Sequence, residues 1–412
     1  MKMQIMKKKE SQGITKQESA MLQGIAVLLM IYHHFFNDLS VYGEKLRFWN
    51  AEVVMHLAWF GKICVGIFAF VSGYGMFKVL EHKAGGAIVK RCVSQTLGLL
   101  IRYWIVLLVF MGAFFSMGKR SFEPREFLLN FFCVSDSYNG AFWYVQEYVI
   151  FMLLLILVHG FFVTFSKKGE AARGKGISKV FYGIIVLAGL LWIGLSAAIP
   201  SVRETLRLSL DTIRIAFVLV FFMGYFSSRF HTFESLFDRL NILNFSAKNH
   251  GAKSYNAQSY SAQNHSFINY FLQRLLGFLL CGAVMALRML LADAPSYARL
   301  DFLFVPVFAL GLIMLFYKRT DDGKSVPGLL GALLERLGHL SVYLWLTHLF
   351  VFDLTKDLVY KITNSHFIFF LLEAAICIFV GYTCYLAEYY AKNLASSICK
   401  ITKTTQNSEM SK

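Results

Sequence analysis

Long apolar runs separated by short polar segments fill most of the chain between residues 20 and 391. A membrane-spanning helix needs about 20 predominantly apolar residues. Ten runs come close to this length or exceed it, at 20–37, 56–78, 93–117, 142–165, 179–199, 208–228, 268–292, 300–317, 337–354 and 365–391. The pattern predicts an all-α, polytopic membrane protein with about ten transmembrane helices.

Composition and charge exclude other classes of protein. Of the 412 residues, 57% are hydrophobic and 16% are charged, whereas a soluble domain is about 45–50% apolar and about 25% charged. The net charge of +16 comes from basic residues clustered between the apolar runs, which is typical of cytoplasmic loops and not of nucleic-acid binding. The cysteines are scattered without a CxxC pair, so we expect neither structural disulfides nor a metal site.

Lys and Arg residues are divided unequally between alternate segments. The N-terminus, the even-numbered loops and the C-terminus hold 26 of them, and the odd-numbered loops hold 10. The positive-inside rule therefore predicts that both termini are cytoplasmic. We expect a basic N-terminus at 1–19, a membrane domain at 20–392 and a cytoplasmic tail at 393–412, in a bacterial plasma (inner) membrane.

One inner loop, 229–266, is long and rich in Asn, Ser, Ala and Gln. It contains a near-repeat, SAKNH at 246–250 and SAQNH at 261–265. Such a segment cannot bury enough apolar surface to fold alone, so we expect a disordered cytoplasmic loop.

The first apolar run carries the polar residues best arranged for a site. Gln23 and His34 are eleven residues apart, so on a helix they lie within about 20° of the same face and roughly 16 Å apart along the axis. This stripe suits an extended ligand that enters from the cytoplasm and reacts at His34. His33 points about 100° away and is expected to contact a neighbouring helix.

His34 and Asp38 are the candidate catalytic residues. A histidine can act as a general base near neutral pH, and Asp38, one helical turn further on, could orient its imidazole. Two structural interpretations stay open beside these: His34 as a packed polar residue, and Asp38 as a polar helix end at the membrane interface. In the second run, the small residues Ser72, Gly73 and Gly75 suit either helix packing or space for a ligand.

Four segments, in order, resemble the acyltransferase 3 family of integral membrane enzymes, which acylate sugars and surface glycans. Residues 22–34 resemble the family's first-helix pattern L-R-G-I-A-I-L-x-V-x-x-x-H, and residues 68–74 resemble F-F-x-x-S-G-[FY]. Residues 143–145 (WYV) resemble W-[FY]-[LV], and residues 338–348 resemble G-x-x-S-Y-x-x-Y-L-x-H. Together these segments span almost the whole chain.

The resemblance implies transfer of an acyl group, usually acetyl, from cytoplasmic acetyl-CoA to a hydroxyl of a carbohydrate acceptor, with no metal. His34 matches the family's catalytic histidine and His348 its second histidine, for which a structural hydrogen bond is an equal alternative. The residues expected to bind acyl-CoA or acceptor are Gln23, Ser72, Lys90, Arg91, Arg102, Trp143, Tyr144, Ser341 and His348. Expected partners are membrane lipid and glycan-assembly proteins, and not nucleic acid.

The chain departs from the family pattern where the donor's phosphates would bind. Gln23 replaces the family's arginine, and Gln95 and Gly98 fall at a basic R-x-x-R pair, with Lys90 and Arg91 about a turn earlier as substitutes. Glutamine lacks the charged, bidentate fork with which arginine binds phosphate. We therefore expect weakened or rearranged CoA binding.

Several alternatives remain open from the sequence. Ser72, Tyr144 and Arg102 are candidate donors to a developing oxyanion, but Arg102 could equally be an interfacial anchor or pair with a carboxylate such as Glu147. A transporter or glycan flippase is a second function, although the two halves lack the internal repeat common in transporters. An inactive scaffold of a glycan-assembly complex is a third, favoured by Gln23.

Overall fold

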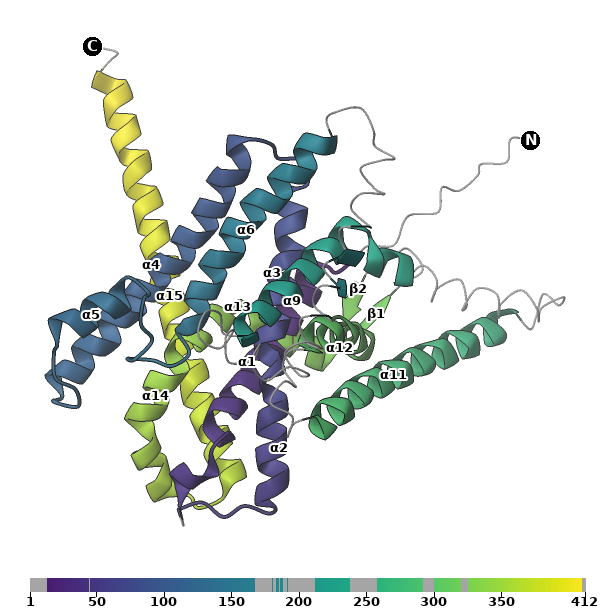
Figure 1. The fold of residues 1–412 in the computed structure, drawn as a ribbon, viewed down its shortest axis with the longest axis horizontal. Coiled ribbons are helices and arrows are strands. Elements are labelled where there is room, and N and C mark those ends of the chain that lie inside the picture. The colour runs from purple at the N-terminus through teal and green to yellow at the C-terminus, as the bar shows by residue number, and fades with distance from the viewer. Residues whose placement is uncertain are drawn as a thin grey trace. The chain divides into compact units, whose positions relative to one another are not determined.

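The computed structural model is almost entirely α-helical (Figure 1). It describes residues 13–43, 45–166, 212–237, 258–291, 300–319 and 325–409, with a few single positions between 180 and 191. The helices are α1 (Lys16–Phe36), α2 (Ala51–Gly61), α3 (Ile63–Leu80), α4 (Gly86–Ser116), α5 (Pro124–Phe131), α6 (Trp143–Ser166), α9 (Thr212–Arg229), α11 (Gln258–Leu290), α12 (Asp301–Phe316), α13 (Leu329–His339), α14 (Ser341–Ile362) and α15 (His366–Glu409). A 3-10 helix, η1 (Leu39–Tyr42), and an antiparallel pair of short strands, β1 (Tyr317–Arg319) and β2 (Ser325–Pro327), complete the described elements.

The prediction of an all-α, polytopic membrane protein is confirmed. Six described helical stretches, one of them α2 and α3 taken together as Ala51–Leu80, are long and apolar enough to cross a membrane, or seven if α13 and α14 form one broken span. Two further apolar helices, Ala216–Arg229 within α9 and α12, are shorter. Helices suit this role because lipid offers no hydrogen bonds, so the backbone must satisfy its own. The number of ten spans and the cytoplasmic termini stay predictions, and most of the run 179–199 lies outside the described residues.

Two predicted runs are broken helices. The run 56–78 divides at Lys62, whose N–H bonds to the carbonyl of Trp59 at 3.2 Å. This i→i−3 bond tightens the last turn of α2 and ends it. The run 337–354 begins inside α13, which ends at His339, and α14 starts two residues later at Ser341. Hydropathy alone does not report such breaks, because the residues on both sides are equally apolar.

The predicted loop 229–266 is shorter than expected, because α11 begins at Gln258. Neither Pro nor Gly occurs between residues 258 and 276, so the helix extends beyond its apolar part. The second copy of the near-repeat, 261–265, therefore lies in α11. The first copy, 246–250, lies outside the described residues, as does all of 238–257.

The chain forms two compact units. Unit 1 comprises residues 1–39, 50–101 and 143–339, and unit 2 comprises residues 40–49, 102–142 and 340–412. In unit 1, α1 packs on α13 and α3 packs on α9. A Cβ at Gly24 would overlap the Leu334 carbonyl, and one at Gly338 would overlap the Ala20 carbonyl. These two glycines of the family-like motifs therefore permit the close approach of α1 and α13.

Among the small residues of the run 56–78, some pack against another helix and some have open space beside them. A Cβ at Gly73 would overlap the backbone of Phe221 on α9, and one at Gly224 would overlap Phe70 on α3. Gly73 is thus a helix-packing residue, as one of its two interpretations predicted. A Cβ at Gly75 would meet nothing within 4 Å.

Unit 2 is built around α14 and α15. The ring of Phe350 on α14 stacks on Phe110 of α4 at 5.0 Å between centroids. The Trp345 indole donates to the carbonyl of Ala141 at 3.1 Å, and Arg102 binds Glu388 of α15. These contacts join segments far apart in the sequence into one unit.

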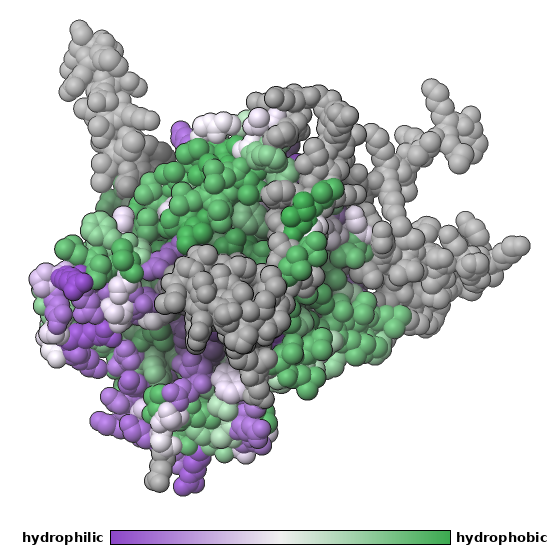
Figure 2. All heavy atoms as spheres, in the orientation of Figure 1, coloured by the Kyte–Doolittle hydropathy of each residue, from purple (hydrophilic) through white to green (hydrophobic). Residues whose placement is uncertain are grey.

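Apolar side chains also cover the outside of the helices. Figure 2 shows them gathered over α4, α6 and α11, where Ile105, Leu157 and Phe278 are each more than half exposed. Large exposed apolar areas are unfavourable in water. A lipid surrounding therefore accounts for them.

Candidate functional site

Helix α1 carries both Gln23 and His34, the two ends of the predicted polar stripe, without interruption. It begins with a capping box, in which the Thr15 side chain accepts from the Glu18 N–H at 3.1 Å and the Glu18 carboxylate accepts from the Thr15 N–H at 2.8 Å. From there the helix is continuous to Phe36. Gln23 and His34 thus share a helical face, and both side chains are partly exposed.

The end of α1 lies against the end of α2. Nδ1 of His33 lies 2.7 Å from the carbonyl oxygen of Ala58, which confirms that His33 contacts a neighbouring helix. The rings of His33 and His34 are 5.2 Å apart between centroids. His34 therefore stands beside a histidine that is bound to a second helix.

Asp38 lies beyond the helix. Asp38 follows α1, which ends at Phe36 with Asn37 as its cap, and its role beside His34 stays a prediction. The Asp38 side chain is exposed. This position agrees with a polar residue that follows the helix end.

A buried ion pair lies in the same unit. Nε and Nη2 of Arg288 on α11 each lie 3.0 Å from a carboxylate oxygen of Asp301 on α12, and both side chains are fully buried. Nη1 of Arg288 also reaches the carbonyl oxygen of Phe60 at 3.5 Å. Arg288 and Lys62 both lie within electrostatic range of His33. The pair therefore belongs to the polar surroundings of the α1 and α2 ends.

The sequence prediction omitted this pair, although a signal for it was present. Arg288 and Asp301 stand at the facing ends of two consecutive apolar runs, 268–292 and 300–317. Charges of opposite sign at membrane depth are expected to pair or to serve a site.

The WYV segment at the start of α6 contributes further buried groups. Glu147 is fully buried and Tyr144 is 8% exposed. Tyr144 lies within electrostatic range of Glu147 and of Cys64 on α3, and Cys64 lies within range of Arg288 and Asp301. The ring of Trp143 packs on Phe217 at 5.7 Å. Tyr144 is thus a buried hydroxyl in the same unit as the ion pair.

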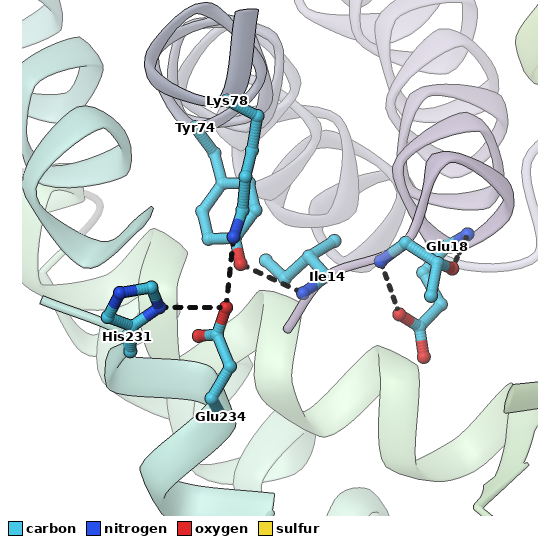
Figure 3. A network of polar contacts seen from close by, with 7 residues as sticks. Ile14, Glu18, Tyr74, Lys78, His231 and Glu234 are labelled. Atoms are coloured by element: carbon cyan, nitrogen blue, oxygen red, sulfur yellow. Dashed lines mark hydrogen bonds and ion pairs between the residues drawn. The ribbon is translucent and has the colours of Figure 1, made fainter. Parts of the chain in front are cut away.

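Ser72 lies midway along α3 (Ile63–Leu80). Helices α1 and α3 run antiparallel. Gly61, just before α3, lies beside His33 near the end of α1. The Tyr74 hydroxyl of α3 accepts from the N–H of Ile14 at 3.0 Å, just before α1 begins (Figure 3). Ser72 is therefore placed near the start of α1. At about 1.5 Å per residue, Ser72 lies roughly 16 Å along the helices from Gly61, which is beside His33.

Figure 3 shows a polar network around this opposite end of α3. Lys78 donates to Glu234 at 3.1 Å, and His231 lies 3.5 Å from the same carboxylate oxygen. Ile14 is buried beside Tyr74. The network ties the residues before α1 to α3 and to the turn after α9.

The basic candidates have separate surroundings. Lys90 is exposed, and Arg91 is half-exposed and faces the Gln95 amide one turn further along α4. Nε and Nη2 of Arg102 donate to the two carboxylate oxygens of Glu388, at 2.8 and 2.9 Å. A structural pair was one expectation for Arg102, but the partner is Glu388 and not Glu147.

Ser341 and His348 lie on α14 in unit 2, and both are buried. Nδ1 of His348 lies 2.9 Å from the carbonyl oxygen of Trp345 and 3.1 Å from that of Leu344. The Cys377 thiol of α15 approaches the carbonyl oxygen of His348 at 4.0 Å. These contacts accord with the structural alternative for His348.

Within the described part of the chain, no group of three or more His, Cys, Asp and Glu residues is arranged to hold a metal ion. The cysteines described are free thiols. The polar groups of interest in the interior of unit 1 are therefore its histidines, its ion pair and its tyrosine.

The helices and buried polar residues define a multi-pass membrane protein with a polar interior. The family of acyltransferase domains known as acyltransferase 3 matches residues 20–386, and the chain belongs to it. It is thus a membrane acyltransferase. No curated protein and no solved structure matches the chain significantly.

Proposed function

We propose that the protein transfers an acetyl group from cytoplasmic acetyl-CoA to a hydroxyl of a cell-surface glycan or lipid-linked saccharide. The observation that carries this proposal is the uninterrupted helix α1, which presents Gln23 and His34 on one face. An extended donor can lie along this stripe with its thioester near His34. His34 lies at the far end of α1, so the acceptor can approach it from the opposite side of the membrane.

The proposed reaction is a direct transfer. His34 takes the proton of the acceptor hydroxyl, and the oxygen attacks the thioester carbonyl. The carbon–sulfur bond then breaks, and the leaving thiolate of CoA receives the proton from the imidazolium. An ester and free CoA are the products, and His34 returns to its neutral form.

Tyr144 is the proposed donor to the oxyanion that forms during the attack. Of the three candidates, Ser72 lies toward the start of α1, and the Arg102 guanidinium already binds Glu388 through two nitrogens. Tyr144 is buried in the same unit as Arg288 and Asp301. A Tyr144→Phe variant should lose about 10²–10³-fold in kcat, the usual effect of removing one such donor.

Gln23 is proposed to contact the phosphate-bearing part of the donor. Its amide can donate a hydrogen bond to phosphate but supplies no charge. A Gln23→Arg variant should therefore bind acetyl-CoA more tightly, by about tenfold if one charge-assisted hydrogen bond is gained.

Binding and turnover of radiolabelled acetyl-CoA by the detergent-purified protein test the proposal. Wild type, Gln23→Arg and His34→Ala are compared. Labelled product that disappears in His34→Ala and increases in Gln23→Arg supports the acetyltransferase. If none of the three proteins binds acetyl-CoA, the inactive scaffold, which Gln23 favours, or the glycan flippase replaces it.

A further inference from the structure

The break between α2 and α3 leaves backbone carbonyls that side chains must satisfy. In a continuous helix the Lys62 N–H would bond to the Ala58 carbonyl, but here it bonds to Trp59. The carbonyl of Ala58 receives the imidazole of His33 instead. The Phe60 carbonyl is approached by Arg288. Two side chains from other helices thus cap the end of α2.

His33 is held in one orientation by this contact. A carbonyl oxygen can only accept, so Nδ1 of His33 carries the proton and donates it to Ala58. Gly61 allows the approach, because a Cβ there would lie 2.7 Å from the Leu29 carbonyl oxygen and 3.2 Å from Cβ of His33. The last turn of α1 is therefore fixed against the end of α2, and His34 belongs to that turn.

Arg288 and Asp301 fix the other side of the same helix end. Their bidentate contact joins α11 to α12, and Nη1 of Arg288 extends it to Phe60. Both side chains are fully buried, so water cannot replace either partner and the ion pair is strongly held. A continuous set of contacts leads from Asp301 through Arg288 and α2 to His33.

We propose that His33, Arg288 and Asp301 are positioning residues that set the location and ring orientation of His34 for proton removal. This inference rests on the proposed function of His34. A displacement of about 1 Å at a reacting group can reduce the rate by about 10²-fold. None of the three residues needs to touch the substrate for this effect.

The first test distinguishes the effect of the hydrogen bond that His33 donates from the effect of the space that its side chain fills. In His33→Asn the side-chain amide can still donate to the Ala58 carbonyl, whereas His33→Leu cannot. His56 supplies the matched control, because its Nδ1 also lies 2.8 Å from a carbonyl, that of Glu52, but within its own helix. Release of free CoA from acetyl-CoA is measured on folded, monodisperse protein.

We expect His33→Leu to lower kcat by about 10²-fold with an unchanged KM for acetyl-CoA. His33→Asn should recover most of the loss, and His56→Leu should match wild type. Equal activity in His33→Leu and His56→Leu would overturn the proposal. So would an equal loss in His33→Asn and His33→Leu.

Arg288→Lys tests the ion pair, because lysine keeps the charge but not the fork. A purely structural role predicts a lower yield of folded protein with normal kcat in the folded fraction. A positioning role predicts a lower kcat and a displaced pH–rate profile in that fraction. Normal kcat and an unchanged profile would remove Arg288 and Asp301 from the proposal.

A spectroscopic measurement separates failure of this inference from failure of the proposed function. The ¹⁵N resonances of histidine report which ring nitrogen carries the proton, without any turnover. We expect the Nδ1-protonated tautomer for His33, and a change in the His34 signals in His33→Leu but not in His56→Leu. If wild type releases no CoA, the proposed function fails, while unchanged His34 signals in His33→Leu contradict the positioning role itself.

Discussion

Two arginine–carboxylate pairs with the same bidentate geometry lie in different surroundings. Arg288 and Asp301 of unit 1 have fully buried side chains. Those of Arg102 and Glu388 in unit 2 are 32% and 21% exposed, and Lys392 also contacts Glu388. Their distances are nearly equal, 3.0 Å in the first pair and 2.8–2.9 Å in the second.

The two pairs thus differ in burial and not in contact geometry. A partly exposed pair can exchange its contacts for water or lipid headgroups and contributes little. A fully buried pair strongly penalises loss of either partner. The buried pair is also the one connected to the end of α2 and to His33. The difference between the two pairs can be tested by substitution.

The largest effect is expected from Asp301→Asn. It leaves the guanidinium of Arg288 buried without its counter-charge, which should lower the free energy of unfolding by about 3–5 kcal/mol. Thermal unfolding of the detergent-purified variant measures this loss. A decrease no greater than that of Glu388→Gln would show that burial does not distinguish the two pairs.

Replacing both charges of the buried pair should restore most of this stability. In Arg288→Met with Asp301→Leu no buried charge remains, and such replacements are often neutral or stabilising. We expect the double variant to unfold at a higher temperature than Asp301→Asn while its kcat stays low. Recovery of activity together with stability would limit the pair to a structural role.

The smallest effect is expected from Glu388→Gln. Partly exposed ion pairs contribute about 0.2–1 kcal/mol, and added salt screens them. The unfolding temperature should therefore change little, and the difference from wild type should shrink further at high salt. A loss as large as that of Asp301→Asn would place Arg102 among the buried, structurally essential charges.

The sequence predicted the features that depend on local spacing. The apolar runs coincide with helices wherever the structure describes them, because hydropathy over about 20 residues is a local property. The common face of Gln23 and His34 and the contact of His33 with a neighbouring helix followed from helical periodicity. Both hold because α1 is not interrupted.

The features that the sequence did not predict depend on breaks and distant contacts. The end of α1 at Phe36 falls before Asp38, whose role beside His34 stays a prediction. The partner of Arg102 is 286 residues away in the chain. Ser72 stays a candidate oxyanion donor, and the antiparallel packing that brings Tyr74 of α3 to Ile14 before α1 did not follow from the sequence. Periodicity carries no information on which helix ends meet.

In the proposed mechanism His34 takes the proton of the acceptor hydroxyl. The most direct test measures the transfer of radiolabelled acetyl from acetyl-CoA to the glycan fraction of membranes that contain the protein. His34→Ala should lose about 10²–10⁴-fold in rate, the usual contribution of a general base, and still bind acetyl-CoA. His56→Ala provides the comparison and should keep the wild-type rate, because its imidazole contacts a carbonyl of its own helix and lies outside the proposed site. Acetyl transfer by His34→Ala at the wild-type rate would contradict the proposed mechanism.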